Sequence, residues 1–249
     1  MKAVGIIPAR MGSSRFPGKP LAPLLGRPMI EHVYKRTAMA SALDEVVVAT
    51  CDTEIRDAVE GFGGRAVMTA DTHERASDRV AEAAAASDAD VVVLVQGDEP
   101  MTAPEMIDQA LAPFADGSGV SCINLTKRII SEEEFRDPNT IKVVMDRSGN
   151  ALFMSREPIP TLVNNRFADI AAYKQVCIIP FTRAALAEFS ALEPTPLEVT
   201  ESIDMMRFLE HGRPVRMVET DVDTHAVDTP ADLDLVAEMM RDDALAGSY

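Results

Sequence analysis

The sequence has few cysteines, and they are spaced too widely to form a framework. Cys51, Cys122 and Cys177 are odd in number and include no C-x2-C pair of the kind that binds zinc. Each lies in or beside an apolar segment, so we expect three small, buried hydrophobic side chains. This usage indicates a reducing compartment, which we expect to be the cytoplasm.

Long hydrophobic runs are also missing. The longest purely aliphatic run is residues 91–95, whereas a membrane-spanning helix needs about 20 apolar residues. The apolar stretch at residues 3–9 is too short for the core of a signal peptide. We therefore expect no membrane partner.

Positive charge is scarce. The 249 residues contain 24 Lys and Arg against 40 Asp and Glu, which gives a net charge of −16. A general nucleic-acid binder needs net positive charge to displace counterions, so that class is excluded. Any phosphate site must be a local basic cluster. The length fits a single domain, residues 1–249.

The segments that are present alternate between short aliphatic runs and longer periodic stretches. This alternation predicts an α/β doubly wound sheet, mostly parallel and covered by helices on both faces. Residues 128–173 mix charge, prolines and short strands, and we interpret them as an excursion from the main sheet. The expected strands are 3–7, 45–50, 65–68, 91–95, 120–125, 141–145, 175–181 and 215–219. The expected helices are 28–39, 54–61, 75–86, 104–114, 184–193, 200–210 and 230–241.

The loop at residues 8–20 follows the first expected strand and carries three cations, Arg10, Arg15 and Lys19. Its glycines and serines, Ser13 among them, supply N–H and hydroxyl groups that can wrap phosphate oxygens. The loop is not a Walker A motif, because Pro20 stands where that motif has Ser or Thr. A solvated basic turn is the alternative.

Two aspartates are candidates for a metal site. Asp98, in Gln96-Gly97-Asp98-Glu99-Pro100, ends an aliphatic strand and is well placed to bind Mg²⁺, which prefers oxygen ligands and often bridges to phosphates. Asp228 directly precedes the expected N-cap Thr229 and would supply a second carboxylate. A strand-terminating turn, and an acid that is favourable beside a helix start, are the structural alternatives.

Residues 73–79 lead into a helix, and their Ser and Arg side chains could contact a base or a ribose. A capped helix start is equally compatible with the spacing. No nucleophile–base pair stands out, and the four histidines form no zinc signature.

Taken together, residues 7–21, 96–100 and 227–233 closely resemble the 3-deoxy-manno-octulosonate (Kdo) cytidylyltransferases, in order and spacing along nearly the whole chain. The resemblance implies a Rossmann-like nucleotidyltransferase fold. It also implies an enzyme that couples CTP to a sugar acid, releases pyrophosphate, needs Mg²⁺ and works as a homodimer, with residues 128–173 as a dimerisation arm. The product of this family is usually used in the assembly of surface polysaccharides, including lipopolysaccharide.

The same resemblance implies roles for individual residues. Arg10, Ser13, Arg15 and Lys19 would clamp the triphosphate, and Asp98 and Asp228 would bind Mg²⁺, with Arg10, Lys19 and the two aspartates forming the catalytic group. The nucleotide contacts would further include His73, Ser77, Arg79 and Gln96, and the acceptor contacts would be Arg156, Gln175 and Asp204.

The chain departs from the family pattern on the acceptor side. Gln175, Cys177 and Ile179 stand where that pattern has His, Gly and Tyr, and Asp204-Met205 stands where it has Glu-Gln. Arg75-Ala76-Ser77 replaces Ser-Gly-Thr near the nucleotide. Two alternatives therefore stay open. The same CTP chemistry could serve an amino sugar acid or a phosphonate, or the chain could be a catalytically silent nucleotide-binding protein.

Overall fold

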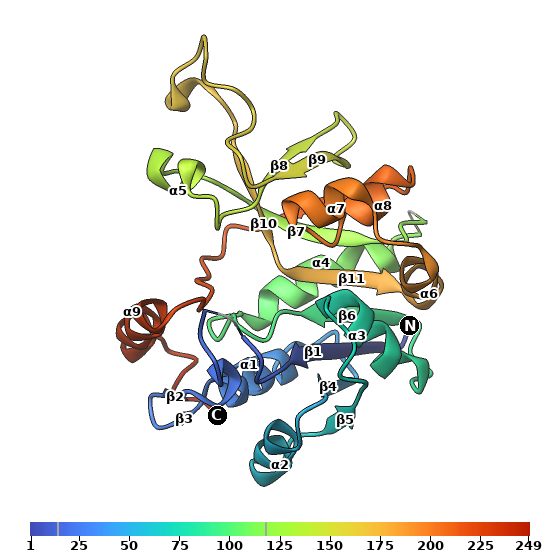
Figure 1. The fold of residues 1–249 in the computed structure, drawn as a ribbon, viewed down its shortest axis with the longest axis vertical. Coiled ribbons are helices and arrows are strands. Elements are labelled where there is room, and N and C mark those ends of the chain that lie inside the picture. The colour runs from blue at the N-terminus through green and yellow to red at the C-terminus, as the bar shows by residue number, and fades with distance from the viewer. Residues whose placement is uncertain (14, 118) are drawn as a thin grey trace.

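The computed structural model describes residues 1–13, 15–117 and 119–249. Within them the chain forms two five-stranded sheets, one below the other in Figure 1, and a two-stranded hairpin. The first sheet has the order β11-β6-β1-β4-β5. Its strands are β11 (Ile178–Thr182), β6 (Val91–Val95), β1 (Ala3–Ala9), β4 (Glu45–Thr50) and β5 (Ala66–Met68).

The first sheet is mostly parallel, as the sequence predicts. β1 pairs in parallel with β4 and β6, β4 pairs in parallel with β5, and only β11 runs antiparallel beside β6. Along β6, Val92 and Leu94 belong to one apolar cluster while Val91, Val93 and Val95 belong to another. Side chains alternate between the two faces of a strand, so a continuous Val/Leu run serves a sheet that is covered on both sides.

Helices cover both faces, which confirms the predicted α/β class. Apolar residues of α3 (Ala76–Ala85), α6 (Arg183–Ala191) and α8 (Met206–Glu210) pack with one face of the sheet. Those of α1 (Met29–Ala38), α2 (Thr53–Gly61) and α4 (Pro104–Ala115) pack with the other. None of the helices in the described part of the chain has the length and apolar character needed to cross a membrane.

The second sheet has the order β12-β7-β10-β8-β9. The predicted excursion, residues 128–173, supplies two strands of this sheet, β8 and β9, and also forms α5 (Glu132–Arg136) and η2 (Phe167–Asp169). A loop of this excursion forms the protrusion at the top of Figure 1. A small apolar cluster of its own supports it, built on Ile129, Phe135 and Ala172. The strands are β12 (Arg216–Glu219), β7 (Ile123–Arg128), β10 (Tyr173–Val176), β8 (Lys142–Met145) and β9 (Ala151–Ser155).

Two expected elements are interrupted. The expected strand 175–181 breaks at Cys177, where the chain leaves β10 of the second sheet and enters β11 of the first. The expected helix 200–210 breaks at Ser202, whose left-handed backbone (φ 54°) ends α7 (Pro196–Glu201) before α8 begins. A periodic apolar pattern continues across both breaks, so periodicity alone does not reveal them.

The C-terminal helix α9 (Pro230–Arg241) lies at the side of the first sheet (Figure 1). Thr229 and Asp232 form a capping box at its start, as the sequence predicts. Its apolar face packs against Leu24 and Met29, beside η1 (Lys19–Leu21) and the hairpin of β2 (Pro23–Leu24) and β3 (Arg27–Pro28). The helix thereby places residues 224–229 against the loop that carries Lys19.

Candidate active site

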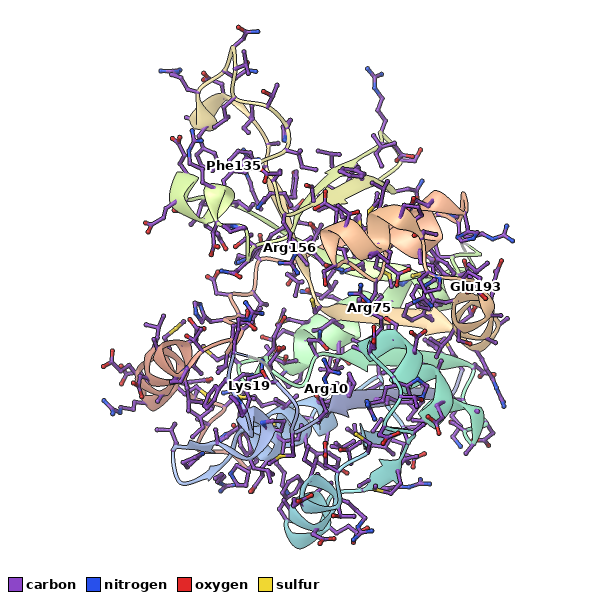
Figure 2. The ribbon with its side chains drawn as sticks, in the orientation of Figure 1. Arg10, Lys19, Arg75, Phe135, Arg156 and Glu193 are labelled. Atoms are coloured by element: carbon purple, nitrogen blue, oxygen red, sulfur yellow. The ribbon has the colours of Figure 1, made fainter. Side chains whose placement is uncertain are left out.

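A cleft of about 390 Å³ opens beyond the carboxyl ends of β1 and β6. This is where ligands bind in open α/β sheets. Every predicted site residue except Arg156 lines it. In Figure 2, Arg10 and Lys19 lie toward β1, Arg75 lies above them near β11, and Arg156 lies higher, at the second sheet. The cleft therefore has a basic floor on the first sheet and a separate wall above it.

The first loop is held in shape by backbone hydrogen bonds. The N–H groups of Ser13 and Gly18 both donate to the carbonyl oxygen of Met11, at 2.9 and 3.0 Å, and Gly18 adopts a left-handed backbone (φ 74°) that favours glycine. Ser14, in the same loop, lies outside the described residues. The Met11 N–H in turn donates to Asp52 Oδ2 at 2.7 Å.

Asp52 is a supporting residue that the sequence analysis missed. It directly precedes α2, two residues after the end of β4, the strand that pairs with β1. An acid just beyond the carboxyl end of a neighbouring parallel strand is the signal that would have found it.

Gly97 lets the β6 loop approach the β1 loop closely. A Cβ atom at this position would lie 2.5 Å from the backbone oxygen of Pro8, a distance that real Cβ contacts do not reach. Position 97 therefore has no room for a side chain. The close approach of the two loops places Asp98 beside the basic loop.

Lys19 lies between the two predicted metal carboxylates. Its Nζ is 2.9 Å from Asp98 Oδ2 and 3.7 Å from Asp228 Oδ1, and it donates to the backbone oxygen of Val227 at 2.7 Å. Only 11% of its side chain is exposed. The backbone N–H of Asp228 is bound by Asp232, the capping residue of α9, at 3.0 Å. The structure thus brings together two aspartates from distant parts of the chain.

Arg15 bridges the mouth of the cleft. Its Nη2 donates to Asp228 Oδ1 at 2.9 Å, and its Nη1 donates to Asn139 Oδ1 at 3.0 Å. Asn139 belongs to the predicted excursion and was not singled out from the sequence. The bridge links the first loop to both α9 and the second sheet.

The donor set at the bottom of the cleft suits Mg²⁺. Asp98 and Asp228 supply hard carboxylate oxygens, and Lys19 shows that a positive charge is accommodated between them. No group of three or more His, Cys, Asp or Glu that could hold a metal occurs among the described residues. Phosphate oxygens and water would therefore have to complete the coordination, as is usual for Mg²⁺.

The predicted nucleotide residues on and before α3 form hydrogen bonds or ion pairs with neighbouring residues. Ser77 Oγ donates to Asp204 Oδ2 at 2.8 Å. Arg79 is buried and donates to the backbone oxygen of Ala70 at 3.2 Å, so it supports the segment that carries His73. His73 itself pairs with Glu82.

The predicted acceptor residues Gln175 and Asp204 line the cleft together with the apolar side chains of Ile141 and Ile179. Gln175 Nε2 donates to Asn124 Oδ1 at 2.5 Å. Arg156 does not line the cleft. Its guanidinium donates to the backbone oxygens of Glu201, Pro138 and Ser202, at 2.8, 3.0 and 3.3 Å. A direct acceptor contact by Arg156 remains a prediction.

Burial shapes the acid–base properties of the site. Burial, and then the charge of Asp98, raises the pKa of Glu99 to about 7. Glu99 Oε2 accepts a hydrogen bond from Thr224 Oγ1 at 3.1 Å, a further tie between the β6 loop and the segment before α9. Burial also raises the pKa of Asp204. Glu99 lies next to the candidate metal ligand Asp98, whereas Asp204 is bound by Ser77 on the other side of the cleft.

Known proteins resemble this chain over nearly its whole length. The profile of the family described as "Cytidylyltransferase" matches residues 4–220. The 3-deoxy-manno-octulosonate cytidylyltransferase of Geobacter metallireducens is 47% identical, over 96% of this chain and 98% of that protein. That of Geotalea uraniireducens is 46% identical, over 97% and 100%.

Solved structures agree as well. A CMP:2-keto-3-deoxy-manno-octonic acid synthetase complexed with CTP superposes with a TM-score of 0.90 and 39% identity, covering 97% of this chain and 99% of that one. A 4-diphosphocytidyl-2C-methyl-D-erythritol synthase from Anaerococcus prevotii, at 15% identity and a TM-score of 0.64, shares the fold.

Proposed function

This chain belongs to the cytidylyltransferase family, and we propose that it transfers CMP from CTP to Kdo with release of pyrophosphate. One observation carries the proposal: Lys19 contacts Asp98 and lies near Asp228 at the bottom of one cleft, beside the loop that holds Arg10 and Arg15. The match to the Kdo relatives extends over nearly the full length of both chains.

In the proposed reaction an acceptor oxygen attacks the α-phosphorus of CTP, and the bond from that phosphorus to pyrophosphate breaks. Arg10, Arg15 and Lys19 bind the triphosphate and stabilise the charge that builds on the leaving group. Ser13 and the backbone N–H groups of the loop orient the phosphates, and His73, Ser77, Arg79 and Gln96 form the nucleotide wall. Catalysis then depends on positioning and charge neutralisation.

We further propose that Asp98 and Asp228 hold Mg²⁺. When bound, Mg²⁺ would neutralise phosphate charge and lower the cost of deprotonating the acceptor hydroxyl. The pair of hard oxygen donors, placed beside a loop that suits phosphates, supports this assignment.

The second sheet supports a proposal about assembly. Ile130 and Val163 expose 84% and 83% of their surface on the excursion of residues 128–173. Exposed apolar side chains on a protruding element are suited to burial against another chain. We propose that this excursion forms a homodimer, and we place the reaction in the cytoplasm, where the free cysteines would stay reduced.

A panel of acceptors tests the function. Pyrophosphate release would be measured with CTP and Mg²⁺ in the presence of Kdo, its amino analogue, sialic-type acids or small phosphonates. Turnover with Kdo supports the proposal and means that Gln175 and Ile179 are compatible with that acceptor. Turnover with another acid alone would keep the CTP chemistry and reject Kdo. CTP binding without pyrophosphate release from any acceptor would contradict catalysis.

A further inference from the structure

Lys19 lies beside both of the carboxylates that would hold a metal ion. Its ammonium group contacts Asp98 at 2.9 Å, lies 3.7 Å from Asp228, and is fixed by the backbone oxygen of Val227 at 2.7 Å. Arg15 also neutralises Asp228, at 2.9 Å. In this arrangement each aspartate already has a cationic partner.

The same two cations are needed elsewhere once nucleotide is bound, because the proposed function assigns Lys19 and Arg15 to the triphosphate. A divalent ion that approaches the aspartates alone meets two like charges at close range, one of them on a side chain with 11% exposure, where water screens poorly. Nucleotide phosphates offer both cations new anionic partners at the moment they leave the carboxylates.

We propose that Lys19 is a positioning residue that acts as an internal counter-ion. In the nucleotide-free protein it neutralises Asp98 and Asp228, and it passes to the triphosphate when CTP binds, so that the divalent ion binds well only together with nucleotide. This inference rests on the proposed function, since it uses the same pair of aspartates.

Binding of Mn²⁺, measured by electron paramagnetic resonance, tests the inference without turnover, because Mn²⁺ accepts the same carboxylate, carbonyl and water ligands as Mg²⁺. Without nucleotide, Lys19→Met should bind Mn²⁺ about tenfold more tightly than the wild type, because two partly buried carboxylates lose their competing cation. With CTP present the order should reverse, because the variant lacks a phosphate contact.

Three further variants make the result specific. Arg15→Gln should tighten Mn²⁺ binding in the same direction, by about threefold, because Arg15 is more exposed. Lys2→Met, which removes an ion-paired lysine at the opposite end of β1, should leave Mn²⁺ binding unchanged. Adding Asp98→Asn to Lys19→Met should abolish the gain.

Unchanged or weaker Mn²⁺ binding in both Lys19→Met and Arg15→Gln would overturn the inference. If circular dichroism shows that Lys19→Met is unfolded, the Mn²⁺ affinity of Arg15→Gln decides the test by itself. Wild-type Mn²⁺ binding that is equally tight with and without CTP would overturn it too. Failure of every acceptor to release pyrophosphate would reject the proposed function and leave the Mn²⁺ comparison intact.

Discussion

Val227 donates its backbone N–H to the carbonyl oxygen of Asp98 at 2.8 Å. This bond joins the loop after β6 to the segment that leads into α9, and it sets the two candidate metal aspartates side by side. Because the bond is between backbone atoms, their spacing does not depend on the conformation of a long side chain. Lys19, which binds the Val227 carbonyl, is fixed by the same segment.

The two aspartates should be separately essential. Asp98→Asn and Asp228→Asn should each lower kcat by about 10²-fold or more, because each change removes an anionic oxygen from the proposed metal pair. Pyrophosphate release measures this loss, and far-UV circular dichroism checks the fold. Asp234→Asn, which alters an exposed carboxylate on the same helix α9, is the control and should retain normal turnover. Near-normal kcat in Asp98→Asn would remove Asp98 from the metal role.

Gly97→Ala should damage both stability and activity. The new methyl group would meet the Pro8 oxygen at 2.5 Å, so the β6 loop must move, at a cost of about 1–3 kcal/mol in the free energy of unfolding. Urea denaturation and CTP turnover measure the two effects. Gly61→Ala has open space around it at the end of α2 and should be neutral. Equal stability of the two variants would contradict the close approach.

Arg207→Leu should be among the most destabilising changes in the chain. Arg207 Nη2 contacts Glu198 Oε1 at 2.7 Å, and the two side chains are 2% and 0% exposed. Removing the cation takes away the nearest partner of a buried carboxylate and leaves only Arg75, at 4.0 Å, which costs about 3–5 kcal/mol. Arg213→Leu breaks an exposed ion pair with Glu188 and should cost less than about 1 kcal/mol. Chemical denaturation of both proteins gives the comparison.

His32 should make stability depend on pH. Its Nε2 donates to the Leu24 carbonyl at 2.8 Å, so Nδ1 accepts from the Tyr249 hydroxyl at 2.8 Å, and the ring is neutral. Burial lowers the pKa of His32 below 6.5. Just below pH 6.5, His32 is therefore more protonated in the unfolded chain than in the folded chain. Stability from this group is therefore complete above pH 6.5 and falls as the pH drops toward the folded-state pKa.

The measurement is the urea midpoint at several pH values. His32→Gln should be less stable than the wild type at pH 7.5, and the loss of stability between pH 6.5 and 5 should be smaller in this variant. His211→Gln, at an exposed position after α8, should keep the wild-type pH dependence. An identical pH dependence in wild type and His32→Gln would contradict the assignment.

Asp52→Ala should weaken CTP binding with little effect on the chemical step. Asp52 holds the Met11 N–H at 2.7 Å, so the variant loses an anchor of the phosphate loop but no group that contacts the reacting atoms. We expect KM for CTP to rise about threefold to tenfold while kcat changes less. A fall in kcat with unchanged KM would argue against an anchoring role.

Much of the first sheet could be predicted from sequence because its signals are local. The Val-rich runs of β4 and β6 and the Thr229–Asp232 capping box each specify their own element. The candidate site was found for a related reason. Lys19 and Asp98 lie in two loops that follow parallel strands, and such loops meet at one edge of the sheet.

The remainder depends on long-range packing. The break at Cys177 arises because one chain segment pairs with β7 and β8 on one side and with β6 on the other, and no local pattern records that exchange. Asn139 reaches the site only through its contact with Arg15, and Arg156 turns toward backbone carbonyls of α7 that are distant in sequence. Such partners are set by tertiary structure.

The bond between Val227 and Asp98 joins two segments that are synthesised at different times. A chain emerges from the ribosome from its N-terminus, so Asp98 is made long before Asp228, and β11, which borders β6, is made in between. The proposed nucleotide site is thus complete only when the segment before α9 docks. On that proposal, a nascent chain without this segment would lack Asp228, and CTP would stabilise completed molecules more than unfinished ones.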